Sequence, residues 1–311
     1  MLFQLYWTDC LAITDILLDI RKGGTLVDEY VRNIILNELK ELEKKENIKI
    51  LFAVESGSRA WGFESKDSDY DVRFVYVRPL EWYMSISKRK NTLEVMINED
   101  LDFAGWDLNK AVELLAKSNP PLGEWLNSSI VYTEKDNIIA EFDKLFDKYL
   151  RENALVYHYL SMASKDMETL REKREIKLKK YFYMLRSLLA SKWVMLYHEK
   201  PPILLSELLT LVKNEAIQRE VDKLLEIKKA GDESTKIVGN EIINEFIFDT
   251  KKEVEGIISL QASATPATRK FQFILQTKQD LILNIATGRY VITVAGNSIA
   301  NQLKGLAEAV Y

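Results

Sequence analysis

Residues 55–74 read ESGSRAWGFESKDSDYDVRF, and this stretch organises the rest of the chain. A Gly-Ser pair at 57–58 is followed, after ten intervening residues, by Asp-Tyr-Asp at 69–71. The branched apolar run at 48–54 predicts a buried strand before the pair, and residues 71–77 predict a second strand after it. The stretch therefore predicts a strand, a tight turn and a strand that carries acidic residues.

The two aspartates are expected to point to the same side of the second strand. Side chains alternate along a strand, so Asp69, Asp71 and Arg73 should share one face. Neighbouring carboxylates repel each other unless a cation lies between them. Mg²⁺ prefers carboxylate oxygens and keeps positions open for substrate phosphates, so the pattern predicts a magnesium site. The alternative is that both aspartates merely lie in a turn.

Composition narrows the class of protein. The chain has 311 residues, of which 47% are apolar, and this is enough for a sizeable core and predicts two domains. A net charge of −4 excludes a global polycation that binds nucleic acid through charge alone. One cysteine excludes a disulfide framework, and two histidines argue against a zinc site.

No targeting or membrane segment is expected. Asp9, Asp15 and Asp19 interrupt the apolar start, which lacks a basic beginning and a small-residue cleavage site. No uninterrupted apolar run reaches the length of a membrane span. We therefore expect a cytoplasmic protein with no membrane partner.

The chain divides into four predicted parts. Residues 1–24 form an N-terminal extension, 25–130 a catalytic unit, 131–260 a helical domain and 261–311 a C-terminal appendage. The catalytic unit alternates helical and strand patterns, whereas the next part is almost entirely helical. The expected fold class is α+β, with a mixed sheet and flanking helices followed by a mostly α-helical domain.

Further elements follow from periodicity and capping signals. In the catalytic unit we expect a helix from Thr25, strands at 92–97 and 100–104, and a helix opened by Gly105 and Asp107 that ends before Pro120 and Pro121. In the helical domain the expected helices are 138–150, 154–170, 178–198, 204–212, 217–229 and 240–259.

The Gly-Ser turn and the acidic pair suit transfer of a nucleotidyl group. Gly57 lets the backbone approach a phosphate, Ser58 can hydrogen-bond a phosphate oxygen, and Arg59 could assist. Two-metal sites of this kind usually need a third carboxylate from a neighbouring strand. Asp102 is the preferred candidate because its strand leads into the next helix, and Glu94 is the alternative.

Longer strings then resemble a known family. ESGSRAWGF-x-S-x-x-SDYDVRF-x-YVRP-x-EWY, LDFAGWDLNKA, KSNPPLGEWLNSSIVY and KLKKYFYMLRSLLASKW resemble the YcgL-type, RNA-ligase-associated (RlaP) nucleotidyltransferases, within the DNA polymerase β-like superfamily. The similarity covers about residues 30–230. It implies a polymerase β-like catalytic domain with a helical second domain. The resemblance specifies the type of reaction more closely than the physiological substrate.

A helix face in the second domain could meet the triphosphate. Lys179, Tyr183 and Arg186 lie at i, i+4 and i+7, hence on one side of the predicted helix, with Lys180 as a substitute. The two cations could hold phosphates while Tyr183 stacks on base or ribose. A solvated charged surface is the competing interpretation. Arg73 could pair with an aspartate or touch phosphate.

The leading hypothesis is an enzyme that moves NMP from an NTP, such as ATP, to a hydroxyl and releases pyrophosphate. Asp69 and Asp71 would bind two Mg²⁺ ions, with Mn²⁺ as an alternative, and Asp102 would complete the site. An RNA acceptor, a tRNA or an RNA 3′ end, would favour a positive groove formed by Arg78 and residues 88–90. The acceptor could instead be a protein side chain or a small molecule.

A second hypothesis is a noncatalytic nucleotide- or RNA-binding module that keeps the fold. Its signature would be loss of a metal-binding aspartate. Asp69, Asp71 and Asp102 are all present, which favours the enzyme. The four tryptophans that stand out, Trp61, Trp82, Trp106 and Trp125, are expected to pack in the core or between domains.

Overall fold

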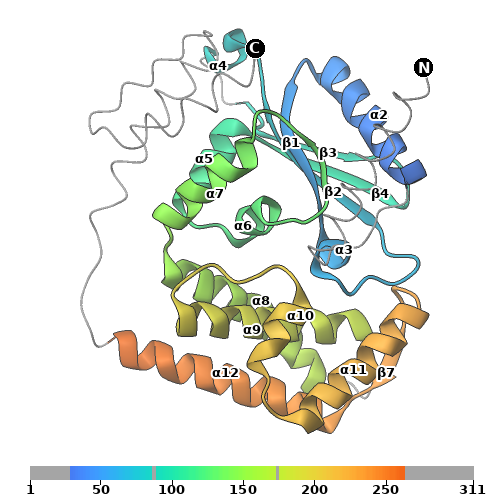
Figure 1. Cartoon of the computed structure of the whole chain (residues 1–311), viewed down its shortest axis with the longest axis vertical. Helices are drawn as coiled ribbons and strands as arrows, with labels where there is room; N and C mark the ends of the chain where they lie inside the picture. The colour runs from blue at the N-terminus through green and yellow to red at the C-terminus, as the bar shows by residue number, and fades with distance from the viewer. Residues whose placement is uncertain (1–28, 86–88, 173–174, 263–311) are drawn as a thin grey trace, which may run out of the picture.

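The structure is a computed structural model that describes residues 29–85, 89–172 and 175–262. A unit with a central sheet lies above a layer of helices along the long axis of the molecule (Figure 1). The predicted extension at 1–24, the helix start at Thr25 and residues 263–311 of the predicted appendage lie outside the described residues. Within the described part, no helix combines the length and apolarity needed to cross a membrane.

The upper unit is built on a mixed five-stranded sheet in the order β3-β4-β2-β1-β5. The strands are β1 (Lys49–Ser56), β2 (Tyr70–Val77), β3 (Thr92–Met96), β4 (Leu101–Asp107) and β5 (Val131–Glu134). Strand β1 is antiparallel to both β2 and β5, and β3 is antiparallel to β4. Strands β2 and β4 are parallel, so the two strands that carry the predicted site begin at the same edge of the sheet.

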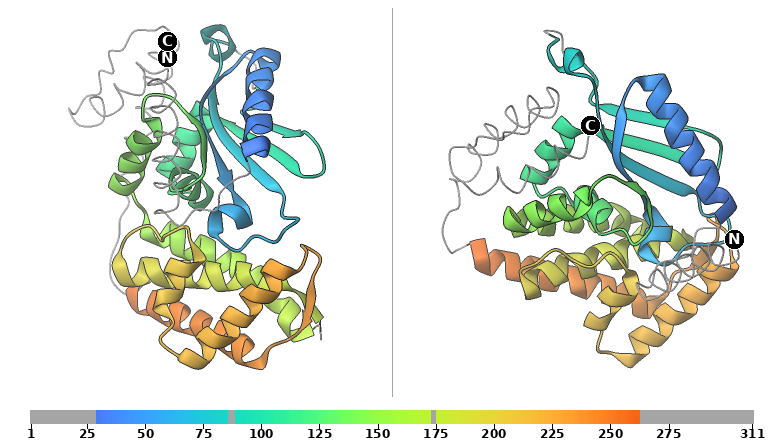
Figure 2. Two further views of the ribbon diagram at one scale, coloured as in Figure 1. Left: turned by 45° about the vertical axis from the view of Figure 1, so that its right-hand side comes forward. Right: turned by 45° about the horizontal axis from the view of Figure 1, so that its top comes forward.

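One face of the sheet is covered by α2 (Glu29–Glu46), as Figure 2 shows on the left. Ile35, Leu39 and Leu42 recur at helical spacing and are buried against this face. Phe74 and Phe103 project to them from β2 and β4. Alternation then sends Asp71 and Asp102 to the opposite face.

That opposite face is covered by α5 (Leu108–Ala116), α6 (Pro120–Leu126) and α7 (Ile138–Lys148). Two short helices complete the unit, α3 (Gly57–Trp61) after β1 and α4 (Leu80–Tyr83) after β2. The core on this side runs without a break into the helical domain. The acidic face of the sheet is therefore turned toward the domain junction.

The helical domain is centred on the antiparallel pair α8 (Glu152–Glu172) and α9 (Leu178–Tyr197). The remaining elements are α10 (Leu205–Leu208), the 3₁₀ turn η1 (Leu209–Leu211), α11 (Glu215–Ala230), α12 (Glu241–Ala262) and a small ribbon of β6 (Glu175–Lys177) with β7 (Lys236–Val238). Helix α9 is buried along most of its length, and its N-terminal turn begins beside the junction.

Several predicted boundaries are wrong. Gly105 does not open a helix but lies within β4, where a Cβ would come within 2.1 Å of the Phe74 ring. Asp107 ends that strand and caps α5 by accepting a hydrogen bond from the amide of Asn109. The glycine thus serves close packing of the sheet, which helix signals alone do not reveal.

The segment after α5 also differs from expectation. Pro120 and Pro121 do not only stop α5, because they form the first turn of α6, capped by Asn119. The boundary expected at residue 130 falls just before β5, which pairs with β1 in the central sheet. The helix expected at 204–212 is instead α10 followed by η1.

Candidate active site

Asp71 and Asp102 lie directly opposite each other on the parallel strands β2 and β4. On the other side of Asp71, its register partner is Ser56 at the end of β1. Adjacent strands are about 4.8 Å apart, so these carboxylates are close neighbours on one face of the sheet. The sheet therefore brings together the second aspartate of the motif and the preferred third carboxylate.

Arg73 is the cation that contacts both carboxylates. Its Nη2 lies 2.6 Å from Asp71 Oδ1 and 2.8 Å from Asp102 Oδ2. Its Nη1 donates to the backbone carbonyl of Asp102 at 3.1 Å. Of the two interpretations of Arg73, pairing with an aspartate is the one present in this structure.

Gly57 is required by the position of Asp71. The backbone of Gly57 has φ +65°, a left-handed conformation that side chains disfavour. A Cβ on Gly57 would lie only 2.1 Å from Asp71 Oδ2, so any side chain would displace the carboxylate. The Gly-Ser turn thus packs directly against the second aspartate.

The charge around Asp71 is only partly compensated. Burial raises the pKa of Asp71, Arg73 opposes the rise, and the carboxylates of Asp102 and Asp69 add to it. Oxygen ligands that repel one another in this way fit a divalent cation such as Mg²⁺. Across the described part of the chain, no three acidic, histidine or cysteine side chains are grouped closely enough to hold a metal ion as they stand.

Asp69 lies just outside the strand pairing that aligns Asp71 with Asp102. It precedes β2, its side chain is exposed, and burial together with the nearby Glu233 raises its pKa, while Lys179 lowers it. Lys179 comes from the first turn of α9 and pairs with Glu233 at 3.1 Å. The face of α9 expected to meet phosphate therefore approaches Asp69 at this one lysine.

Tyr183 lies one turn further along α9. Burial and the negative charge of Asp71, Glu233 and Asp69 raise the pKa of its hydroxyl to about 12. Its ring contacts Trp61 edge-on at 5.4 Å and Phe63 at 6.3 Å. Tyr183 is thus within electrostatic range of the aspartates but is held by aromatic packing.

Arg186 does not belong to the phosphate-binding face that was expected on this helix. Its side chain is only 2% exposed and pairs with Glu124 at 2.8 Å. It also donates to the carbonyl of Ile203 and stacks over the Trp61 ring at 4.3 Å. Helix α9 is buried in the core at this position, so Arg186 does not reach the surface that Lys179 occupies. We therefore remove Arg186 from the residues expected to bind phosphate. The substitute Lys180 pairs with Asp166 at 2.6 Å.

Ser58 and Arg59 shape the loop that leads to the aspartates. Ser58 Oγ hydrogen-bonds Ser68 Oγ at 3.2 Å. Arg59 donates to the carbonyls of Ser68 and Asp69 and lies over the Tyr70 ring at 3.8 Å. Both residues therefore tie the Gly-Ser turn to the segment just before β2.

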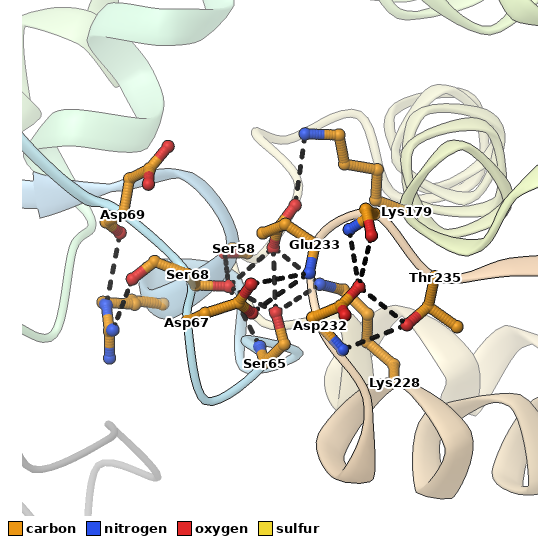
Figure 3. A network of polar contacts seen from close by, with 12 residues as sticks. Ser58, Ser65, Asp67, Ser68, Asp69, Lys179, Lys228, Asp232, Glu233 and Thr235 are labelled. Atoms are coloured by element: carbon orange, nitrogen blue, oxygen red, sulfur yellow. Dashed lines mark hydrogen bonds and ion pairs between the residues drawn. The ribbon is translucent and has the colours of Figure 1, made fainter. Parts of the chain in front are cut away.

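That loop is fastened to the helical domain by Glu233 (Figure 3). Glu233 accepts hydrogen bonds from Ser68 and from the buried Lys228, each at 2.6 Å. Its amide donates to Asp67, and Ser65 donates to its carboxylate at 3.1 Å. Sequence reasoning missed the links from Glu233 to Ser65 and Ser68, because they join residues more than 160 positions apart.

Glu55 is a second residue that sequence reasoning missed. It is fully buried, and it accepts a hydrogen bond from the Asp71 amide at 2.9 Å and another from the Tyr132 hydroxyl. Burial raises the pKa of Glu55 to about 7. A glutamate that ends an apolar strand beside Gly-Ser was a signal that could have identified it.

Two other sets of candidates lie further away. Glu94 lies on β3, opposite Ala104 of β4. Strand β4 therefore separates Glu94 from Asp71, and the Glu94 side chain is exposed. Arg78 follows β2 at its far end, about 23 Å from Asp71 at about 3.3 Å per residue, and donates to the carbonyl of Glu46. Arg78, the first residue of the expected groove, is therefore not beside the aspartates, and Lys88 lies outside the described residues.

Comparison with known proteins agrees with the resemblance seen in the sequence. The profile of the RNA repair pathway DNA polymerase beta family matches residues 31–270. An uncharacterised protein, YcgL, of Bacillus subtilis (strain 168) is 43% identical over 243 residues, which cover 78% of this chain and 94% of that protein.

A solved structure described as a nucleotidyltransferase-like protein, from Exiguobacterium sibiricum 255-15, aligns with 73% of this chain and 75% of its own. Its identity is 11% and its TM-score 0.29, so it carries no weight in the assignment. The family profile spans the sheet, the aspartates and the helical domain. The chain belongs to the RNA repair pathway DNA polymerase beta family.

Proposed function

We propose that this protein is a nucleotidyltransferase that moves NMP from an NTP to a hydroxyl group and releases pyrophosphate. The observation that carries the proposal is the row formed by Asp71 and Asp102 on adjacent parallel strands, with the Gly57 turn packed against Asp71. Family membership supports the same chemistry at a coarser level.

Asp102 is assigned to the acceptor. Its carboxylate accepts the proton of the acceptor hydroxyl, whose oxygen then forms a bond to the α-phosphorus. The bond from that phosphorus to the bridging oxygen breaks, and pyrophosphate leaves with the electron pair. Arg73 holds Asp102 through its side chain and its carbonyl, so the carboxylate is oriented before the acceptor arrives.

Asp69 and Asp71 are assigned to magnesium, and Lys179 to the triphosphate. Bound Mg²⁺ would supply neutralisation of the charge on the transferred and leaving phosphates. Lys179 adds positive charge from α9, and its partner Glu233 keeps it near Asp69. The Gly57 backbone and the Ser58 hydroxyl remain the proposed contacts for a phosphate oxygen. Tyr183 stays within reach of the same region.

We propose RNA as the acceptor and test ATP first as the donor. The family description places its members in an RNA repair pathway, and this description supports an RNA 3′ end over a protein or a small molecule. A labelling screen with each α-labelled NTP, Mg²⁺ and either short RNA or total cellular RNA tests both choices.

The mechanism makes a defined prediction for that screen. Label transfer should disappear in Asp69→Ala, Asp71→Ala and Asp102→Ala, while Glu81→Ala, an exposed acid on α4, should label like the wild type. Equal labelling by the aspartate variants would refute the proposal. Circular dichroism of each variant checks that the fold is kept.

A noncatalytic binding module is the second candidate, and one observation favours it. Arg73 pairs with both Asp71 and Asp102, and so it partly neutralises them without a metal. In that case NTP or RNA should bind without transfer, and binding should be the same in Mg²⁺ and in EDTA. Transfer of label to any acceptor excludes this alternative.

A further inference from the structure

A cavity of about 670 Å³ opens beside Asp102 at the domain junction. Asp102 and Arg73 line it from the sheet, Glu94 from β3, and Glu124 from α6. Its volume falls within the range of about 300–1,000 Å³ that is typical of small-molecule sites. The proposed sites for magnesium and the triphosphate do not occupy this cavity. It adjoins Asp102, the carboxylate proposed to accept the proton of the acceptor hydroxyl.

Indole rings form much of the wall. Trp61, Trp106 and Trp125 all line the cavity, and the rings of Trp106 and Trp125 are stacked at 3.7 Å. Trp61 is held in place because its Nε1 donates to Glu124 at 3.1 Å and the guanidinium of Arg186 lies over its ring. Each of Trp61 and Trp106 has one face covered, by Arg186 and Trp125, and the indole surface that remains at the cavity favours a flat ring as the occupant. The expected packing role of these tryptophans is therefore not their whole role.

The charge of the cavity excludes a polyphosphate. Three carboxylates line it, those of Asp102, Glu94 and Glu124, whereas Arg73 is the one cation in its lining and Arg186 pairs with Glu124 from behind. Arg73 is itself paired with Asp71 and Asp102. The neutral part of a substrate can enter, whereas phosphates are better placed on the side of Lys179.

The carboxylates also select the kind of ring. An ionised carboxylate only accepts hydrogen bonds, so the ring must donate. The exocyclic amino groups of adenine, cytosine and guanine donate, whereas uracil has no amino group and can donate only through its ring N3–H. Glu124 already accepts bonds from Trp61, Tyr159 and Arg186. Glu94 is exposed at the cavity and is free to turn toward the ring.

We infer that this cavity binds the terminal nucleoside of the acceptor, with a base that carries an amino group, and that Glu94 reads that amino group. The inference rests on the proposed function, because the hydroxyl of this nucleoside would then lie next to Asp102. It adds a substrate preference, for acceptors that end in adenosine, cytidine or guanosine over uridine.

The first test measures binding without any transfer. Calorimetric titration of the full chain with adenosine, cytidine and uridine, in the absence of NTP and metal, should give affinities for the first two at least about tenfold tighter than for uridine. Trp106→Leu should weaken adenosine binding at least about tenfold, because stacking is lost. Trp82→Leu is the matched control, since Trp82 lies on α4 and does not line the cavity.

The second test measures label transfer to RNA oligonucleotides that differ only in the last base. Glu94→Gln should narrow the KM preference for adenosine over uridine ends from about tenfold to less than about threefold, with the KM for NTP unchanged, since glutamine can also donate. Glu81→Gln, a change at an exposed acid on α4, should leave the preference intact. Glu94 lies on an exposed edge position, so this variant tests the inference even if Trp106→Leu does not fold.

The outcomes separate the two proposals. Selective nucleoside binding that Trp106→Leu removes supports the cavity assignment even if no transfer is found. Transfer with equal KM for all terminal bases, unchanged in Glu94→Gln, overturns the cavity assignment and leaves the proposed function standing. Absence of nucleoside binding together with absence of any base preference also overturns it.

Discussion

Two acidic clusters lie near the domain junction, and their carboxylates respond to their surroundings in opposite ways. Glu233 is surrounded by donors from Lys228, Lys179 and Ser68, and these interactions hold its pKa down at about 2 against the effect of burial. Burial raises the pKa of Asp71, and a second carboxylate, Asp102, adds to the rise against one shared arginine. The first cluster is a satisfied structural link (Figure 3), whereas the second has a deficit of positive charge.

The difference indicates where a ligand belongs. A network whose charges are already matched gains little from a further cation, and it resists rearrangement. A cluster with unmatched negative charge gains from one, so a structure that keeps such a cluster at a domain junction points to a function. The Glu233 cluster holds the loop before β2 in place, and the Asp71 cluster is left for the chemistry.

The largest effect on stability is expected from removing Lys228 from the Glu233 cluster. Lys228 is 1% exposed and pairs with Glu233 at 2.6 Å, so Lys228→Met should cost about 3 kcal/mol of unfolding free energy. Thermal unfolding should show a drop in Tm of about 5 °C. Lys229→Met, at the exposed neighbouring position, is the control and should change Tm little. Equal Tm values for both variants would show that the link is not structural.

A smaller effect is expected from displacing Asp71 within the other cluster. In Gly57→Ala the new Cβ would meet Asp71 Oδ2 at 2.1 Å, and relieving the clash moves the carboxylate by about 1 Å. Label transfer should fall about a hundredfold, the size of loss that such a misplacement causes.

Gly62→Ala provides the matched control for this change. Gly62 also has a positive φ, +80°, but its nearest neighbour to a Cβ is Leu204 at 3.4 Å. The two variants therefore share backbone strain and differ in contact with Asp71. Label transfer should stay near the wild-type rate in Gly62→Ala. A similar loss in both variants would assign the effect to strain.

Magnesium should stabilise the protein through the unmatched cluster. At tenfold excess over its dissociation constant, a ligand bound only to the folded state adds about 1.4 kcal/mol. The Tm measured in Mg²⁺ should then exceed the Tm in EDTA by about 2 °C. Asp71→Asn should remove this difference, while Glu233→Gln should keep it. The same magnesium effect in Asp71→Asn would place the ion elsewhere.

The smallest effect on stability is expected from lowering the pH, which protonates Glu233. The pKa of Glu233 is lowered on folding, so its contribution to stability is complete above about pH 4.5 and is lost as the pH falls toward 2. The Tm difference between wild type and Glu233→Gln should therefore shrink between pH 5 and pH 3. We expect a change of about 1 kcal/mol, because Glu233 is 24% exposed and solvent screens its partners. A constant difference would mean that Glu233 keeps its ordinary pKa.

Much of the molecule could be predicted because its signals are local. The strands on both sides of residues 57–69 and the long helices of the second domain follow from apolar periodicity. Asp102 is the preferred third carboxylate because its strand leads into the next helix, and the structure sets it opposite Asp71. Both inferences depend only on residues that are close to one another in the sequence.

The parts that could not be predicted depend on distant partners. Lys179 and Arg186 have the same helical pattern, yet α9 leaves one beside Asp69 and buries the other against Glu124. Glu233 lies in the short polar segment between α11 and β7, and its sequence does not indicate that Lys228 and Ser68 surround it. β5 was missed because a four-residue strand is recognisable only by its pairing with β1.

The amino-acid pattern was sufficient to define the strand–turn–strand motif at 55–74, its paired carboxylates and the class of chemistry they suit. Alternation along a strand and the conformational freedom of glycine act over a few residues, so they can be read directly. Tertiary structure alone decided that Asp71 shares Arg73 with Asp102, while Asp69 precedes β2 and lies near Lys179 and Glu233. It also placed an indole-lined cavity beside them. The reason is that strand register, burial and charge compensation depend on segments far apart in the chain.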